Sequence, residues 1–158
     1  MKIIYKTVLV LTLLIMTTAC GGETQNNSST ANQNNRASEP QLTEFQLEHG
    51  IGPVTSVVDL GELNMEWVEE GRQIFEMKCE MCHTMNNRIV GPPLGDIMER
   101  RSAAFVMNMI LNPQEMTNKH PEGQRLLREY MTIMPFQNVQ RDQARAIVEY
   151  LRTQSSDS

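Results

Sequence analysis

The chain has 158 residues, a length that suits one folded domain with additional segments outside it. Its net charge is −5 and it contains only 14 lysine and arginine residues, which argues against a nucleic-acid-binding surface and against a basic membrane-surface helix. Aromatic residues make up 5% of the chain, whereas there are 12 methionines, so methionine must supply much of the apolar volume of the core.

The N-terminus has the pattern of a targeting segment. Lys2 and Lys6 give it a positive start, an apolar run over 8–16 follows, and small residues end it. The run is shorter than the roughly 20 apolar residues that a bilayer-spanning helix needs, and it predicts a signal peptide instead. With Cys20 directly after Ala19, the segment resembles a bacterial lipoprotein signal, which implies that Cys20 is lipidated and becomes the first residue of the mature chain. The alternative is ordinary secretion, in which Cys20 is incidental.

Residues 21–40 are polar and include no large apolar side chain. Such a segment buries too little surface to offset the entropy lost on ordering, so we expect a disordered tether. The predicted organisation is a signal peptide at 1–19, the tether at 20–40, an irregular N-terminal arm at 41–63, a folded domain at 64–153 and a disordered tail at 154–158.

The folded domain is expected to be all-α with long loops, because apolar residues recur at helical spacing and no segment alternates as a strand would. Asn64 and Ser102 are placed to cap helices, and Asn112-Pro113 is placed to end one. Four helices are predicted, from Asn64 to Cys79, from Ser102 to Asn112, from Glu122 to Tyr130 and from Gln140 to Leu151.

The residues that carry chemistry are Cys79-Glu80-Met81-Cys82-His83. The Cys-x-x-Cys-His spacing is that of covalent c-type haem attachment. Two thiols three residues apart on a helical turn reach the two vinyl groups of one porphyrin, and His83 then lies under the iron as its proximal ligand. If Cys20 carries lipid, every cysteine of the chain has a role.

Three other interpretations of this motif compete with haem attachment. A structural zinc site needs four ligands, and the motif supplies three. A thioredoxin-type dithiol would start a helix in a βαβ setting, whereas this pair ends an amphipathic helix. A disulfide between Cys79 and Cys82 would be strained and would leave His83 without a role.

The stretch Gly71–Thr84 resembles the first helix and haem motif of class I cytochrome c. The resemblance covers about residues 64–152 and implies the class I cytochrome c fold, with three to five helices around one covalent haem c. Gly91-Pro92-Pro93-Leu94 is similar to the family's loop in which a proline carbonyl accepts the N–H of the proximal histidine, and Pro92 is the match. Such a hydrogen bond fixes the orientation of the imidazole ring and raises its basicity as a ligand.

The same resemblance implies a close contact between the first and last helices of the domain. Gly71 stands where the family's glycine lets the two helices cross tightly, and Phe75 stands where an aromatic residue packs at the crossing. On the last helix, Ile147 and Tyr150 match the partner surface.

In the cytochrome c family the distal iron ligand comes from a loop before the last helix, commonly beside a proline. Met134 precedes Pro135 in such a loop, so the resemblance assigns it as the sixth ligand. Met131 is its chief rival, and Met116, His120 or an open site are the remaining alternatives.

Other side chains carry weaker hypotheses. His49 and His120 are expected on exposed loops. Trp67 either covers a haem edge or belongs to the core. Four arginines either pair with haem propionates or are solvated, namely Arg100, Arg101, Arg125 and Arg128.

With an imidazole and a thioether on the iron, no position is left for a substrate, so the resemblance implies an electron carrier and not an enzyme. The lipid anchor implies a place at a membrane of the bacterial cell envelope, facing the periplasm. Residues 105–113 and the arm before Trp67 are similar to lipoprotein cytochromes associated with nitrous oxide reduction. The expected partners are therefore a quinol-oxidising complex as donor and a nitrous oxide reductase or a terminal oxidase as acceptor. The alternatives are a gas-binding or peroxidatic haem protein with a labile distal ligand, and a haem-free thiol redox lipoprotein.

Overall fold

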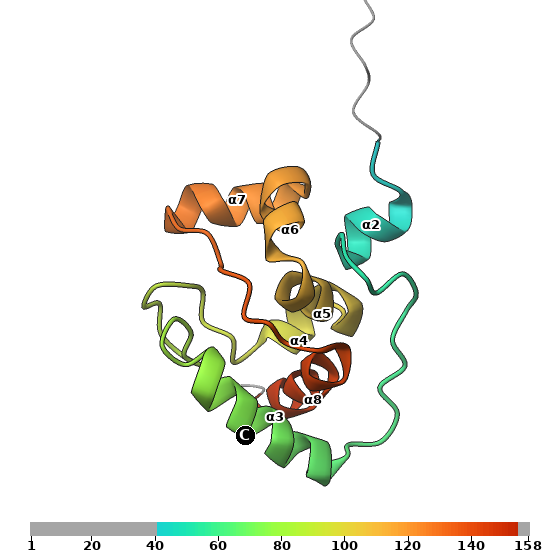
Figure 1. Ribbon diagram of the computed structural model, residues 1–158, viewed down its shortest axis with the longest axis vertical. Coiled ribbons are helices and arrows are strands. Elements are labelled where there is room, and N and C mark those ends of the chain that lie inside the picture. The colour runs from blue at the N-terminus through green and yellow to red at the C-terminus, as the bar shows by residue number, and fades with distance from the viewer. Residues whose placement is uncertain (1–40, 155–158) are drawn as a thin grey trace, which may run out of the picture. The chain divides into compact units, whose positions relative to one another are not determined.

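A computed structural model describes residues 41–154 of the chain (Figure 1). The predicted signal peptide, Cys20, the predicted tether and all of the predicted tail except Gln154 lie outside these residues. The described residues contain no strand, which confirms the all-α class. None of their helices is long and apolar enough to cross a membrane. The helices are α2 (Glu44–His49), α3 (Met65–Lys78), α4 (Ile97–Arg100), α5 (Ala103–Leu111), α6 (Pro113–Lys119), α7 (Pro121–Tyr130) and α8 (Arg141–Arg152).

The four helices predicted from the sequence are α3, α5, α7 and α8, and each agrees with its prediction to within one residue at both ends. The two predicted caps are present. The Asn64 side chain accepts hydrogen bonds from the backbone N–H groups of Glu66 and Trp67 at 3.0 and 3.1 Å, and Ser102 Oγ accepts one from Phe105 N–H at 3.2 Å.

Residues 41–154 form seven helices, more than the three to five that were expected, because three short helices (α2, α4 and α6) were not predicted. The arm is not irregular throughout: α2 forms because Thr43 and Gln46 make a reciprocal capping box, in which each side chain accepts the other's backbone N–H. Pro113 follows the end of α5, as predicted, but it also begins α6, since the first residue of a helix needs no N–H. The third, α4, is a single turn.

The helices α3 and α8 make the most extensive contact between helices of the described chain, and they cross in Figure 1. At the crossing the two backbones are so close that a Cβ atom on Gly71 would lie 2.0 Å from the carbonyl oxygen of Ala146. The rings of Phe75 and Tyr150 lie beside the crossing, with centroids 5.4 Å apart, and Ile147 is buried. The contact expected between the first and last helices is therefore confirmed.

The arm at 41–63 is held against α5 by the fully buried side chain of Asn108. Its carboxamide nitrogen donates to the backbone carbonyls of His49 and Val54, at 3.0 and 2.9 Å, and its oxygen accepts from Val54 N–H at 3.0 Å. Nearby, the backbone N–H of Ile51 donates to the buried sulfur of Met116 at 3.0 Å. Buried polar groups need such partners, so these bonds specify how the arm lies on the helices.

Both His49 and His120 are buried, at 8% and 3% exposure, so the prediction that they lie on exposed loops is wrong. His120 caps α7: its Nδ1 accepts from Glu122 N–H at 3.1 Å, and its Nε2 donates to the Leu47 carbonyl at 3.2 Å. His49 Nδ1 lies 2.8 Å from Ser102 Oγ. Each imidazole is buried by a hydrogen-bonded contact between the arm and the later helices, His49 with Ser102 and His120 with Leu47, which local sequence does not show.

Replacing Gly71 with alanine should destabilise the domain strongly, because the added methyl group would overlap the α8 backbone and force the two helices apart. Overpacking of this kind typically lowers the free energy of unfolding by about 1–3 kcal/mol. Chemical denaturation measures the change, with Gln73→Ala on the exposed face of α3 as the control. Equal stabilities of the Gly71→Ala and Gln73→Ala variants would contradict the observed crossing.

Candidate functional site

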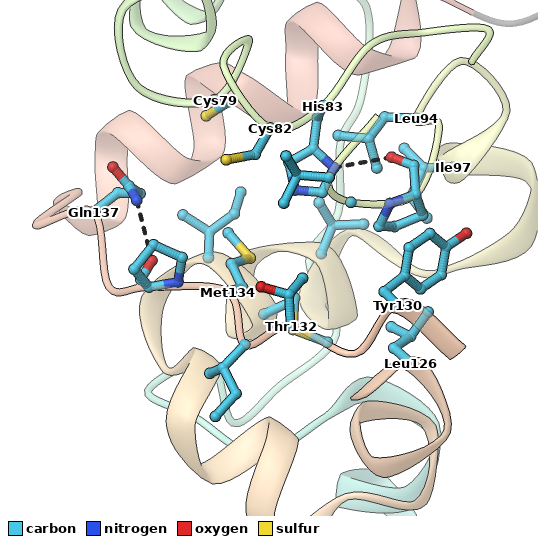
Figure 2. A pocket seen from close by; sticks show the side chains of 18 of the residues that line it. Cys79, Cys82, His83, Leu94, Ile97, Leu126, Tyr130, Thr132, Met134 and Gln137 are labelled. Carbon is cyan, nitrogen blue, oxygen red and sulfur yellow. Dashed lines mark hydrogen bonds between the residues drawn. The ribbon is translucent and has the colours of Figure 1, made fainter. Parts of the chain in front are cut away.

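An apolar cavity of about 370 Å³ lies between the C-terminal end of α3, α5, α7, α8 and the two loops at 79–96 and 131–140 (Figure 2). Its volume is within the range of about 300–1,000 Å³ that is usual for cofactor sites. Val90 and Ile133 line it and are 47% and 53% exposed, so the cavity reaches the surface at these residues. Apolar side chains form most of the walls, including Phe75, Val106, Met109, Ile110, Leu126 and Leu127.

The motif residues lie where α3 ends. Cys79 is the C-terminal cap of the helix, and its carbonyl accepts hydrogen bonds from the N–H groups of Cys82 and His83 at 3.0 and 2.9 Å. This turn brings all three side chains to one wall of the cavity, as Figure 2 shows. Both cysteines are free, and burial raises the pKa of the Cys79 thiol to about 11, so the group is protonated at neutral pH.

His83 is held in one tautomer by the loop that follows it. Its Nδ1 lies 2.9 Å from the Pro92 carbonyl oxygen, which can only accept, so Nδ1 carries the proton and Nε2 keeps a free lone pair. Burial lowers the pKa of the imidazole, and the hydrogen bond to Pro92 opposes that shift only in part. Gly91 packs on the ring: a Cβ atom there would lie 2.4 Å from His83 Cε1. The structure therefore shows the predicted contact with Pro92, and the lowered pKa favours the neutral imidazole, in which Nε2 is available as a ligand.

The structure separates the two rival methionines. Met134 lines the cavity and is half-buried, and Figure 2 shows it across the cavity from His83. Met131 is 82% exposed, caps the end of α7 in a left-handed conformation (φ 54°) and does not line the cavity. Of these two methionines, Met134 is the one whose side chain lines the same cavity as His83.

The other candidate ligands lie elsewhere. Met116 and His120 are buried in the contact with the arm and do not line the cavity. Trp67 lies on α3 under the guanidinium of Arg145, which is 5.0 Å from the ring centroid, and it does not line the cavity either. None of the four arginines proposed as partners of haem propionates lines the cavity within residues 41–154. Three of them form ion pairs elsewhere: Arg100 with Asp96, and both Arg101 and Arg125 with Glu122.

Five polar side chains line the cavity that the sequence did not single out: Lys78, Thr117, Tyr130, Thr132 and Gln137. They come from α3, α6, α7 and the loop after α7, and no motif or spacing connects them. Tyr130 also helps to join the 79–96 loop to the C-terminal end of α7, because the guanidinium of Arg88 lies 4.2 Å from its ring centroid and donates to the adjacent Glu129 carbonyl at 2.9 Å.

Comparison with known families gives a decisive match. The family model described as cytochrome c matches residues 68–155, which is more than half of the chain. The chain belongs to the cytochrome c family. A search of curated protein sequences found no match.

Solved structures agree with this assignment. A cytochrome c from Rhodothermus marinus is 36% identical and superposes with a TM-score of 0.67, covering 72% of this chain and 97% of that one. An engineered form of that protein, Rma TDE, is also 36% identical, with a TM-score of 0.66, and covers 71% of this chain and 97% of its own. A further structure of Rma TDE was solved with a bound carbene intermediate and has a TM-score of 0.64.

Members of the cytochrome c family bind one covalently attached haem c, and Cys79 and Cys82 are consistent with the attachment motif. The residues of this chain fit that group. One apolar cavity receives two free thiols and a neutral imidazole on one wall and a thioether on the other, which is a donor set suited to a c-type haem. The strands that a thioredoxin-type dithiol would require are absent from residues 41–154.

Proposed function

We propose that this cytochrome c is a lipid-anchored monohaem electron carrier, which passes single electrons from a membrane donor to a reductase or oxidase in the periplasm or at the membrane. Family and fold support the electron-carrying role. The observation that carries the proposal is the placement of His83 and Met134 on opposite walls of one apolar cavity. When both side chains are iron ligands, no coordination position remains for a substrate, so the chain acts as a carrier and not as an enzyme.

Each residue of the site has one role in this proposal. The thiols of Cys79 and Cys82 would hold haem covalently, each by adding across one vinyl group with a new C–S bond, the thiol hydrogen going to the other vinyl carbon. His83 Nε2 and the Met134 sulfur would be the two side-chain ligands of the iron. The bound haem supplies one-electron chemistry through the Fe(II)/Fe(III) couple.

The protein provides the environment of the haem iron. Pro92 holds the imidazole ring in place through its carbonyl, and a thioether ligand favours the reduced state and raises the potential. The apolar walls exclude water. The exposed lining residues Val90 and Ile133 mark the place where the cavity meets solvent, so electrons would enter and leave on that side.

The partners follow from the resemblance and the predicted anchor. A quinol-oxidising complex is the proposed donor, and a nitrous oxide reductase or a terminal oxidase is the proposed acceptor. A lipid on Cys20 and a polar tether at 20–40 would keep the domain near such complexes at a membrane of the bacterial cell envelope while leaving it free to reorient.

Covalent haem attachment is tested with variants of the two thiols. Cys79→Ala should leave one thioether bond at most, and the Cys79→Ala/Cys82→Ala double variant should carry no covalent haem, because residues 41–154 contain no other thiol. Haem staining of denaturing gels and mass measurement after acidified acetone extraction report the bound haem. Covalent haem that persists in the double variant would contradict the assignment of Cys79 and Cys82 as the attachment residues. Absence of haem from the wild type would favour the thiol redox alternative.

The distal ligand is tested by replacing each of the two methionines in turn. Met134→Ala should abolish the methionine-to-Fe(III) charge-transfer band, lower the potential and let the reduced iron bind carbon monoxide stoichiometrically. Met131→Leu should leave all three properties unchanged, since Met131 lies at the surface away from the cavity. Carbon monoxide binding by the wild type that is as fast and as complete as in Met134→Ala would instead favour a gas-binding or peroxidatic protein.

The anchor is tested with Cys20→Ser. The variant should move from the membrane fraction to the soluble fraction, because its predicted lipid is lost. Ser29→Ala in the predicted tether serves as the control and should stay in the membrane fraction. If Cys20→Ser stays membrane-bound at high salt, the lipid on this residue is not what holds the protein.

A further inference from the structure

Residues 132–139 carry Met134 and form the α7–α8 loop between its two capping residues, Met131 and Gln140; this stretch has few hydrogen bonds. It connects α7 to α8 and contains neither helix nor strand. Within residues 41–154, its only hydrogen bond to another segment runs from the Lys78 ammonium group to the backbone carbonyl of Gln137, at 3.1 Å. Its other hydrogen bond is internal, from Gln137 Nε2 to the Pro135 carbonyl at 3.2 Å.

Lys78 reaches this loop from the wall that carries the haem motif. It is the last residue of α3 and directly precedes Cys79. Lys78 and Gln137 both line the cavity and are both half-buried, and Figure 2 shows Gln137 on the side of the cavity where Cys79 lies. The bond therefore joins the segment that carries His83 directly to the segment that carries Met134.

We propose that Lys78 is a positioning residue for the Met134 sulfur: it clamps the loop closed and thereby sets how readily the sulfur leaves the iron. This inference rests on the proposed function, in which Met134 is the distal ligand. A hydrogen bond from a charged donor is stronger than a neutral one, and partial burial protects it from water. Without it, the loop can move away from α3 and break no other hydrogen bond to the rest of the described chain.

Packing would still hold the loop in the folded protein after the clamp is lost. Val139 is buried, and Met134 packs against the main hydrophobic core. Removal of the Lys78 hydrogen bond therefore loosens the loop and does not unfold the domain. We expect it to change the rate of ligand exchange at the iron.

Carbon monoxide binding to the reduced full-length holoprotein tests the clamp, because it requires Met134 to leave the iron. Lys78→Met should bind carbon monoxide about tenfold faster than wild type, which corresponds to the loss of one charge-assisted hydrogen bond. Lys119→Met is the matched control: it changes the net charge equally, but Lys119 is exposed on α6, pairs with Glu115 and does not line the cavity. Its rate should equal that of wild type, and Lys78→Arg, which keeps a cationic donor, should bring the rate back towards it.

The methionine-to-Fe(III) charge-transfer band gives a second readout. On heating, Lys78→Met should lose this band well before its helical circular dichroism, whereas Lys119→Met should behave as wild type does. Lys78→Gln, which is neutral and too short to reach the loop, repeats the test if Lys78→Met folds poorly. Equal carbon monoxide rates in the Lys78 and Lys119 variants would overturn the clamp. Absence of covalent haem or of the band from the wild type would instead overturn the proposed function, before any variant is compared.

Discussion

The close crossing of α3 and α8 is the constraint on which the cavity depends. Gly71 lets the α3 backbone approach the carbonyl of Ala146, and no residue with a side chain can replace it without moving a helix. The motif with Cys79 follows directly from the end of α3, and the loop with Met134 leads directly into α8. Both walls of the cavity are thus continuous with the same helix pair, so the crossing constrains how far His83 lies from Met134.

A buried charge cluster extends this framework to the N-terminal arm. Glu149 on α8 is fully buried between Arg145 and Arg152, and these arginines donate to the backbone carbonyls of Leu60 and Gly61 at 3.1 and 3.0 Å. A buried carboxylate is costly unless it is paired and hydrogen-bonded, and here both conditions hold. Because Asn108 fastens an earlier part of the arm to α5, the arm is held to two of the helices that form the cavity, and its contribution to the site is to restrain those helices.

Backbone carbonyls of loops orient the groups that face the haem cavity. The Pro92 carbonyl selects the tautomer of His83, and the Gln137 carbonyl receives Lys78 beside the loop of Met134. Any residue can supply a carbonyl, so such contacts place few demands on side-chain identity. The proline at position 92 matters for the path of the loop, and Gly91 matters because the imidazole leaves no room for a Cβ atom.

Local features of the sequence were sufficient to predict the four longest helices, the two caps and the Cys79, Cys82 and His83 motif, because helical periodicity, capping and ligand spacing all act within a few residues. The resemblance to cytochrome c added the helix crossing and the contact of His83 with Pro92. The resemblance also favoured Met134 over Met131, and the structure agrees in placing only Met134 of the two at the cavity wall. Tertiary structure alone decided what depends on distant segments: the burial of His49 and His120 where the arm meets the helices, and the bond from Lys78 to Gln137. In each of these cases the deciding partner lies dozens of residues away or on another helix, and only the packing of the whole domain brings the two together.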